Sequence, residues 1–214
     1  SMWSTATRAL CQHGPSAVFL ALALYLLLRA RSRPSPYFWT GLLLGFSYLI
    51  RPTNALAVAF IGLYVLAREG RLVWLYLLGV AVPLVPYMAG NWLSFGNIFP
   101  PYSYQLFERL ATPRLFLEGL AGTLVSPARG LFIFTPVLLF AVYGVHVRLK
   151  GRLSPINLDL YVAAILVSHW VIVSMFEDWG GAWSIGPRYF VDVLPFLVYF
   201  LIPVLRGGLL TVCP

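Results

Sequence analysis

Three arginines stand at the ends of apolar stretches, and the chemistry of their side chains suits phosphate. Arg51 follows one apolar stretch, Arg129 precedes another and Arg188 stands just before the last. A guanidinium carries a planar fork of N–H donors that matches the oxygens of a phosphate group. Each arginine is also explained as a helix end whose long side chain reaches the lipid headgroups. The three are therefore candidate phosphate ligands, with that structural interpretation left open.

Further candidates gather beside the same stretches. His13 lies in the sequence QHG just before the first of them, and Asn54 closely follows Arg51. Aromatic residues flank the later ones, and amphipathic rings prefer a membrane interface. A phosphate-bearing lipid with its tail between helices would suit such a set of residues. The aromatic candidates are Tyr102, Tyr104, Trp179 and Trp183.

Glu177 and Asp178 form the only adjacent pair of acidic residues in the chain. Carboxylates at the mouth of a membrane cavity would serve as a general base or bind a divalent cation. The pair is better explained as solvated charge or as a local partner of Arg188. Asp192 follows Arg188 at the spacing of an ion pair across one helical turn. His169 lies inside an apolar stretch and is interpreted as a residue that hydrogen-bonds between helices.

The elements that position these residues are apolar. Hydrophobic residues make up 60% of the 214 positions, charged residues 10%, and the mean hydropathy is +0.82. A soluble domain carries about 25% charged residues. This chain has too few charges to cover a globule, so lipid must form part of its solvent. Seven apolar segments alternate with polar loops, at 16–28, 37–50, 53–67, 72–92, 130–147, 158–176 and 189–205.

These segments predict an all-α fold, a transmembrane bundle of about seven spans that forms one membrane domain over residues 1–214. A helix needs about 20 residues to cross about 30 Å of hydrocarbon. Several segments are shorter, a shortfall that polar flanks, snorkelling arginines or local thinning of the bilayer would meet. Because Pro52 favours a helix start, Arg51 and Pro52 are interpreted as a tight turn between two helices. One long kinked helix with a buried arginine is the alternative.

Basic residues orient the bundle as a multi-pass protein of the plasma (inner) membrane. With the chain starting outside, nine of the fifteen Lys and Arg fall in short inner loops, in agreement with the positive-inside rule. Two outer loops stand out, at 93–129 and 177–188. Residues 115–124 of the first show the apolar spacing of a short helix lying at the membrane surface. The inner basic residues are Arg29, Arg31, Arg33, Arg68, Arg71, Arg148, Lys150, Arg152 and Arg206.

Other classes of function find little support. The net charge of +8 and a pI near 9.8 would suggest nucleic-acid binding in a soluble protein, but no basic face or stacking platform accompanies the charge. Cys11 and Cys213 lie at opposite ends of the chain without metal-ligand spacing, which argues against a zinc or redox site. The sequence contains no nucleophilic triad, phosphate-binding glycine loop or dinucleotide fingerprint.

The sequence DWGGAWSIGPRY at 178–189, followed by LPF at 194–196, resembles a recurring element of bacterial GT-C glycosyltransferases. These are polytopic enzymes of the protein-mannosyltransferase and aminoarabinose-transferase type. Four further stretches are similar to that group and keep a sensible order along the chain. They are WSTA at 3–6 with QHGP at 12–15, RPTN at 51–54, FGN at 95–97 with PPYSY at 100–104, and SPARGL at 126–131.

The resemblance implies a GT-C fold that transfers a sugar from a polyprenyl-phosphate donor to an acceptor on the outer face of the plasma membrane. It implies that the donor phosphate meets Arg51, Arg129 and Arg188, and that sugar and acceptor meet the two outer loops. The family carries its catalytic acid in a first outer loop, upstream of everything matched in this chain. We therefore expect the chain to be the C-terminal part of such an enzyme, and neither Glu177 nor Asp178 to be that acid.

Two alternatives remain at this point. A transporter or flippase would also have many spans and outer arginines, but transporters place charges near the bilayer midplane on broken helices and show internal repeats. Here the charges cluster at the outer interface and the apolar segments are nearly uncharged, which favours the enzyme. A non-catalytic membrane subunit would need none of the outer polar clustering. The identities of sugar and acceptor, the need for a metal and the oligomeric state do not follow from the sequence.

Overall fold

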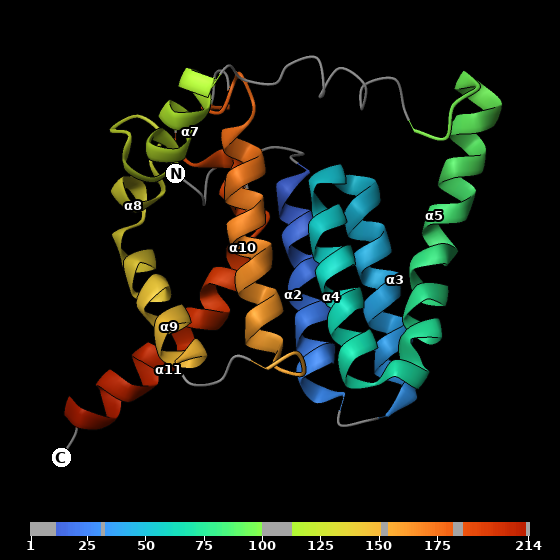
Figure 1. Cartoon of the computed structure of the whole chain (residues 1–214), viewed down its shortest axis with the longest axis horizontal. Coiled ribbons are helices and arrows are strands. Elements are labelled where there is room, and N and C mark those ends of the chain that lie inside the picture. Colours follow the sequence, from blue (N-terminus) through green and yellow to red (C-terminus); the bar gives the residue numbers. More distant parts are fainter. Residues whose placement is uncertain (1–11, 31–32, 100–112, 151–153, 182–185, 213–214) are drawn as a thin grey trace.

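Helices make up the regular structure of this chain (Figure 1). The computed structural model describes residues 12–30, 33–99, 113–150, 154–181 and 186–212. No strand occurs within these ranges, which confirms the all-α expectation. The elements are α2 (His13–Arg29), α3 (Pro34–Ile50), η1 (Pro52–Asn54), α4 (Ala55–Arg68), η2 (Gly70–Leu72), α5 (Val73–Phe95), α7 (Pro113–Val125), α8 (Leu131–Phe134), η3 (Pro136–Leu138), α9 (Leu139–Leu149), α10 (Leu158–Ser174), η4 (Arg188–Val191) and α11 (Leu194–Val212).

Each of the seven apolar segments of the sequence is helical. The fifth, expected to be continuous, is instead broken: α8 ends at Phe134, Thr135 has φ −143° and ψ 70°, and η3 starts at Pro136. The break has a local cause, because proline lacks an N–H and restricts the residue before it to non-helical conformations. The short helix expected at 115–124 is α7.

Arg51 separates two helices, as the tight-turn interpretation required. Its backbone is extended, with φ −142° and ψ 107°, and Pro52 then opens η1. The chain reverses here, so α3 and α4 lie side by side in opposite directions (Figure 1). The alternative of one long kinked helix is therefore wrong.

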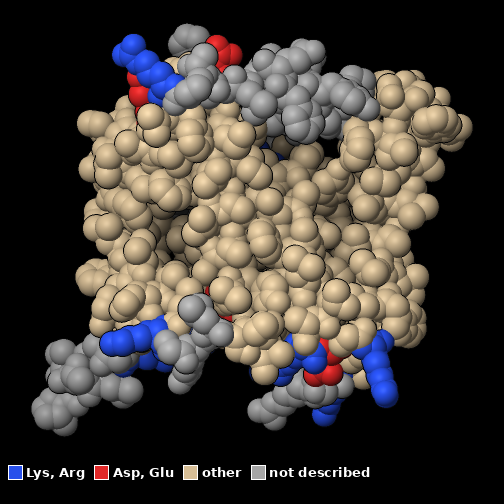
Figure 2. Space-filling view, in the orientation of Figure 1, with Lys and Arg blue, Asp and Glu red and all other residues tan. Residues whose placement is uncertain are grey.

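Successive long helices run in opposite directions along the bundle (Figure 1). We call the end at which α2 starts and α3 ends the upper end, and the end at which α2 and α4 both end the lower end. Figure 2 shows charged side chains at these two ends, with a broad uncharged band between them. In this view the charged side chains thus lie at the ends of the helices, and the assignment of the two ends to the sides of a membrane stays a prediction.

The apolar helices differ in whether they are long enough to cross a membrane. Among the described residues, one helical stretch, Gly70–Phe95, is long and apolar enough to cross a membrane by length and composition. The other apolar helices have 10–17 residues, among them His13–Arg29 and Leu158–Ser174. Seven apolar helices are present, and their crossing of a bilayer stays a prediction.

A buried carboxylate joins three helices at the lower end. Asp159, in the first turn of α10, lies 3.1 Å from Arg148 Nε of α9 and accepts a hydrogen bond of 2.5 Å from the Tyr199 hydroxyl of α11. The Arg148 guanidinium also lies 4.5 Å from the centre of the Tyr199 ring. Since Asp159 is only 5% exposed, its charge depends on these partners.

Asp159→Asn is expected to lower the free energy of unfolding by about 1–2 kcal/mol, because it removes the charge that compensates Arg148 while leaving part of that guanidinium in solvent. Thermal or denaturant unfolding in one detergent measures the change. Glu118→Gln is the control, since its pair with Arg114 is exposed and such pairs contribute about 0–1 kcal/mol. Equal shifts for the two variants would contradict a stabilising role for Asp159.

Candidate functional site

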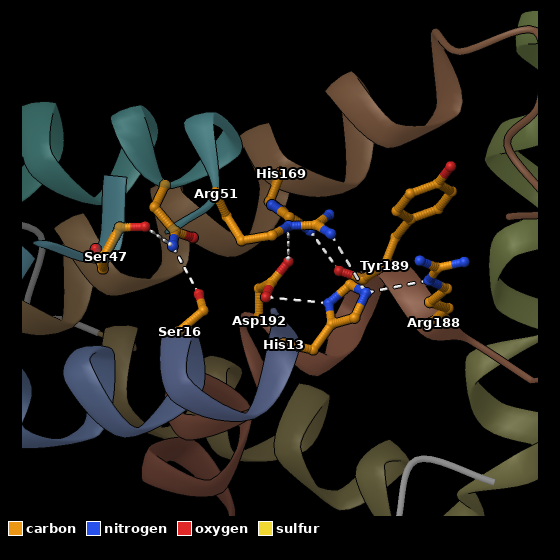
Figure 3. A network of polar contacts seen from close by, with 9 residues as sticks. His13, Ser16, Ser47, Arg51, His169, Arg188, Tyr189 and Asp192 are labelled. Atoms are coloured by element: carbon orange, nitrogen blue, oxygen red, sulfur yellow. Dashed lines mark hydrogen bonds and ion pairs between the residues drawn. The ribbon is translucent and has the colours of Figure 1, made fainter. Parts of the chain in front are cut away.

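Four charged or titratable side chains from distant parts of the chain meet at the upper end (Figure 3). His13 is the first residue of α2, Arg51 lies between α3 and η1, and Arg188 opens η4. Asp192 follows η4 directly, before α11 starts. Each side chain stands at a helix end or a turn, where the change of chain direction points it toward the others.

The contacts of this cluster centre on the His13 ring. Its Nδ1 lies 3.2 Å from Asp192 Oδ1. Its Nε2 lies 3.3 Å from Arg51 NH1 and accepts a hydrogen bond of 3.2 Å from Arg188 Nε. A further ion pair joins Arg51 Nε to Asp192 Oδ2 at 3.1 Å. We call His13, Arg51, Arg188 and Asp192 the arginine cluster.

The geometry fixes the tautomer of His13. A guanidinium has only donors, so Nε2 must be the accepting nitrogen of the ring. The single N–H of a neutral imidazole then lies on Nδ1, and it donates to Asp192 Oδ1. With His13 neutral, one aspartate faces two arginines, and the arginine cluster carries a net charge of about +1.

Asp192 is the buried anion of the cluster. It is 0% exposed, whereas the Arg51 side chain is 14% exposed. Its Oδ2 has the Arg51 ion pair but no well-directed hydrogen bond within the described part of the chain. The charges of Arg51 and Asp192 therefore compensate each other, and the directional bonds run through Oδ1 and His13.

A small pocket adjoins the arginine cluster and contains the third candidate arginine. Arg129 and Arg188 both line it, together with Trp179 and the other residues of 186–190. The Gly186 N–H donates to the Ala128 carbonyl at 3.2 Å, and this bond joins the turn that carries Arg129 to the segment that carries Arg188. Gly186 has φ +90°, a conformation that suits glycine.

Two glycines let the wall of this pocket close. A Cβ on Gly180 would contact the Arg129 guanidinium, and one on Gly122 would contact the Trp179 ring. The turn at 178–181 therefore packs directly between α7 and Arg129. Arg188 contacts His13 together with Arg51 and also lines the pocket together with Arg129, so the three candidate arginines lie in one region.

Asn54 has a structural role close to Arg51 in the chain. It is 3% exposed, and its amide donates to Ser16 Oγ at 2.7 Å and to the Ser47 carbonyl at 3.0 Å. These bonds hold η1 against α2 and α3 and so fix the turn that presents Arg51 (Figure 3).

The remaining candidates from the sequence separate into three groups. Trp179 lines the pocket. Glu177 and Asp178 are exposed at the upper end, and no group of three potential metal-ligating residues is found in the described ranges. Tyr102, Tyr104 and Trp183 lie outside the described residues.

The expected pairing of Asp192 with Arg188 is wrong. Asp192 contacts His13 and Arg51 instead, because 188–191 forms a 3-10 helix rather than the α-helical turn that the spacing assumed. His169 is buried, and its Nε2 lies 2.9 Å from the Tyr189 carbonyl, which joins α10 to η4. Asp192 was therefore not among the candidate site residues, and its sequence signals were its spacing from Arg188 and its place near the start of an apolar segment.

Comparison with known proteins adds no relative: no family model, curated protein or solved structure matches this chain.

Proposed function

We propose that this chain belongs to a membrane glycosyltransferase of the GT-C type, and that its upper end binds the phosphate of a polyprenyl-phosphate sugar donor. One observation carries the proposal. Arg51, Arg129 and Arg188, far apart in the sequence, lie in a single region at one end of the helices, where Arg188 contacts His13 beside Arg51 and lines a pocket with Arg129.

An anionic ligand fits the charge of this region. The arginine cluster has one positive charge in excess, and its Arg188 lines the pocket that Arg129 also lines. Arg188 reaches His13 through its Nε, so its terminal nitrogens do not take part in that bond (Figure 3). Charge-assisted bonds from guanidinium groups to phosphate are short and directional, so a phosphate monoester or diester matches the site better than a neutral ligand.

The surface of the helices supports a lipid environment. Large apolar side chains are exposed on every long helix, and Leu93 near the end of α5 is 85% exposed. Soluble proteins rarely expose contiguous apolar surface on this scale. A helix of 17 residues is about 25 Å long, so bilayer thinning or polar flanks would be needed for these helices to span. Other exposed apolar residues are Leu22, Leu63, Leu77, Val85, Phe140, Val167 and Val198.

The positions of the stretches that resemble GT-C glycosyltransferases support a transferase. Residues 12–15, 51–54, 126–131 and 178–189 carry the resemblance to GT-C enzymes, and the described residues of all four stretches lie at the upper end. Charged side chains lie at the two ends rather than within the band between them (Figure 2). A transporter would instead place charged groups near the middle of the membrane.

A catalytic base is not assigned by this proposal. Asp192 is buried and engaged by His13 and Arg51. Glu177 and Asp178 are exposed and do not line the pocket. The role proposed for the described residues is therefore donor binding.

Arg188→Ala tests the donor site. The full chain in lipid nanodiscs is titrated with farnesyl phosphate, a short polyprenyl monophosphate, and with farnesol, which has the same tail without the phosphate. Loss of one charge-assisted contact is expected to weaken farnesyl phosphate binding by about tenfold or more, while farnesol binding stays unchanged.

Arg71→Ala is the matched control, because this exposed arginine lies at the lower end and its removal changes the net charge equally. It is expected to bind farnesyl phosphate as the wild type does. Wild-type protein that binds farnesol as tightly as farnesyl phosphate would overturn the proposal, as would an equal loss in both arginine variants.

A further inference from the structure

We infer that His13 is a positioning residue for the donor phosphate: its neutral ring holds Arg51 and Arg188 side by side, ready to receive one anionic group. The inference rests on the proposed function, since it concerns the same site. It assigns to His13 a role that neither the arginines nor Asp192 can fill.

Two like charges need an acceptor between them to stay close. Arg51 NH1 and Arg188 Nε lie 3.3 and 3.2 Å from the same atom, His13 Nε2. Asp192 reaches Arg51 directly but reaches Arg188 only through the ring. Nε2 is therefore the atom at which the two cations meet, and Asp192 orients that atom by accepting the Nδ1 proton.

The hydrogen bonds from Arg51 and Arg188 to His13 Nε2 can be exchanged for bonds to a ligand. An imidazole nitrogen has one accepting lone pair, and two guanidinium groups compete for it. A phosphate offers several oxygens that each accept such bonds, and it brings negative charge. The arginines are thus held in place in the absence of ligand and can turn their donors to a phosphate without leaving the site.

General-base catalysis by His13 does not fit the same geometry. The ring is 0% exposed, and the lone pair that would take a proton already faces two cations. His13 contacts the arginines that would hold the ligand and not the ligand itself, so it is a positioning residue.

Two substitutions test the roles of the two ring nitrogens one at a time. A glutamine side chain reaches about as far as Nε2 and offers an amide oxygen there, so His13→Gln keeps an acceptor for the arginines. An asparagine side chain reaches only as far as Nδ1, so His13→Asn keeps a donor for Asp192 but removes the acceptor. Both variants replace the ring by an uncharged amide, and thermal unfolding of each checks that the fold is retained.

The first measurement is farnesyl phosphate binding to the full chain in lipid nanodiscs. His13→Gln is expected to bind farnesyl phosphate within about threefold of the wild-type affinity. His13→Asn is expected to bind it about tenfold more weakly, because both arginines keep their charge but lose the acceptor that holds them in place. Wild-type affinity in both variants would overturn the inference. An equal loss in both would overturn it as well, because an acceptor at the Nε2 position would then not matter.

The second measurement needs no ligand. The chain contains three histidines, so ¹⁵N-labelled histidine gives a simple imidazole spectrum in which the signals lost in His13→Gln belong to His13. A proton on Nδ1 and none on Nε2 supports the inference, and a proton on Nε2 overturns it. If the wild type failed to bind farnesyl phosphate, the proposed donor site would fall, and this spectrum would still decide whether His13 holds the arginines.

Discussion

Asp192→Ala is expected to lower the free energy of unfolding by about 3–5 kcal/mol, the loss typical of removing one partner of a buried ion pair. Asp192 is the anion that offsets Arg51 and accepts the Nδ1 proton of His13. Without it, two guanidinium groups face each other across an imidazole that cannot neutralise them. Denaturant or thermal unfolding in a single detergent measures the change.

A double variant identifies the cause of that loss. Adding Arg51→Met to Asp192→Ala removes the uncompensated cation and keeps an apolar side chain of similar length, so it is expected to restore part of the stability. Glu177→Ala, an exposed carboxylate at the same end, is the control and should change stability little. Additive losses in the double variant would show that repulsion between the arginines is not the reason.

Helical segments were predictable from the sequence because apolar length and composition decide them locally. All seven apolar stretches are helical, and Pro52 marked the turn at Arg51. Pro136 carries the same signal within the fifth stretch, where hydropathy outweighed it in the prediction of one continuous helix. Proline alone does not decide a break, however, because Pro83, Pro86 and Pro203 lie inside continuous helices.

The contents of the site were predictable only in part. Guanidinium chemistry singled out Arg51, Arg129 and Arg188, and the structure brings them to one region. The link between them was not predictable, because His13 and Asp192 are separated by almost the whole chain. Local spacing favoured Arg188 as the partner of Asp192, whereas the 3-10 turn at 188–191 and the packing of α2 against it bring Asp192 to His13.

The short distance between the backbones of α3 and α5 is a second feature that depends on tertiary packing. On α3, Gly41 faces the backbone of Tyr76 and Val80 of α5, and Gly45 faces Pro83. On α5, a Cβ on Gly79 would lie 2.8 Å from Leu42 N and in contact with the Phe38 carbonyl. Small residues allow helix backbones to approach in this way. Because α5 lies at the edge of the bundle (Figure 1) and packs mainly on α3, its position depends on this contact.

Gly79→Val is therefore expected to lower the free energy of unfolding by about 2–3 kcal/mol, since the added side chain meets backbone that cannot rotate away. Gly90→Val is the matched control, because Gly90 lies on the same helix and a Cβ there meets nothing within 4 Å. Both variants share the helix propensity of valine, so unfolding in one detergent isolates the packing effect. Equal stability of the two variants would contradict the close approach of α3 and α5.

The same pair of variants separates the fold from the site. The arginine cluster is held by α2, the turn after α3, and η4 with the residue that follows it, and α5 contributes no side chain to it. Gly79→Val should therefore lower stability while leaving the imidazole spectrum of His13 and the affinity for farnesyl phosphate as in the wild type. A changed His13 spectrum would instead show that α5 helps to position Arg51 through α3, and that the upper end depends on the whole bundle.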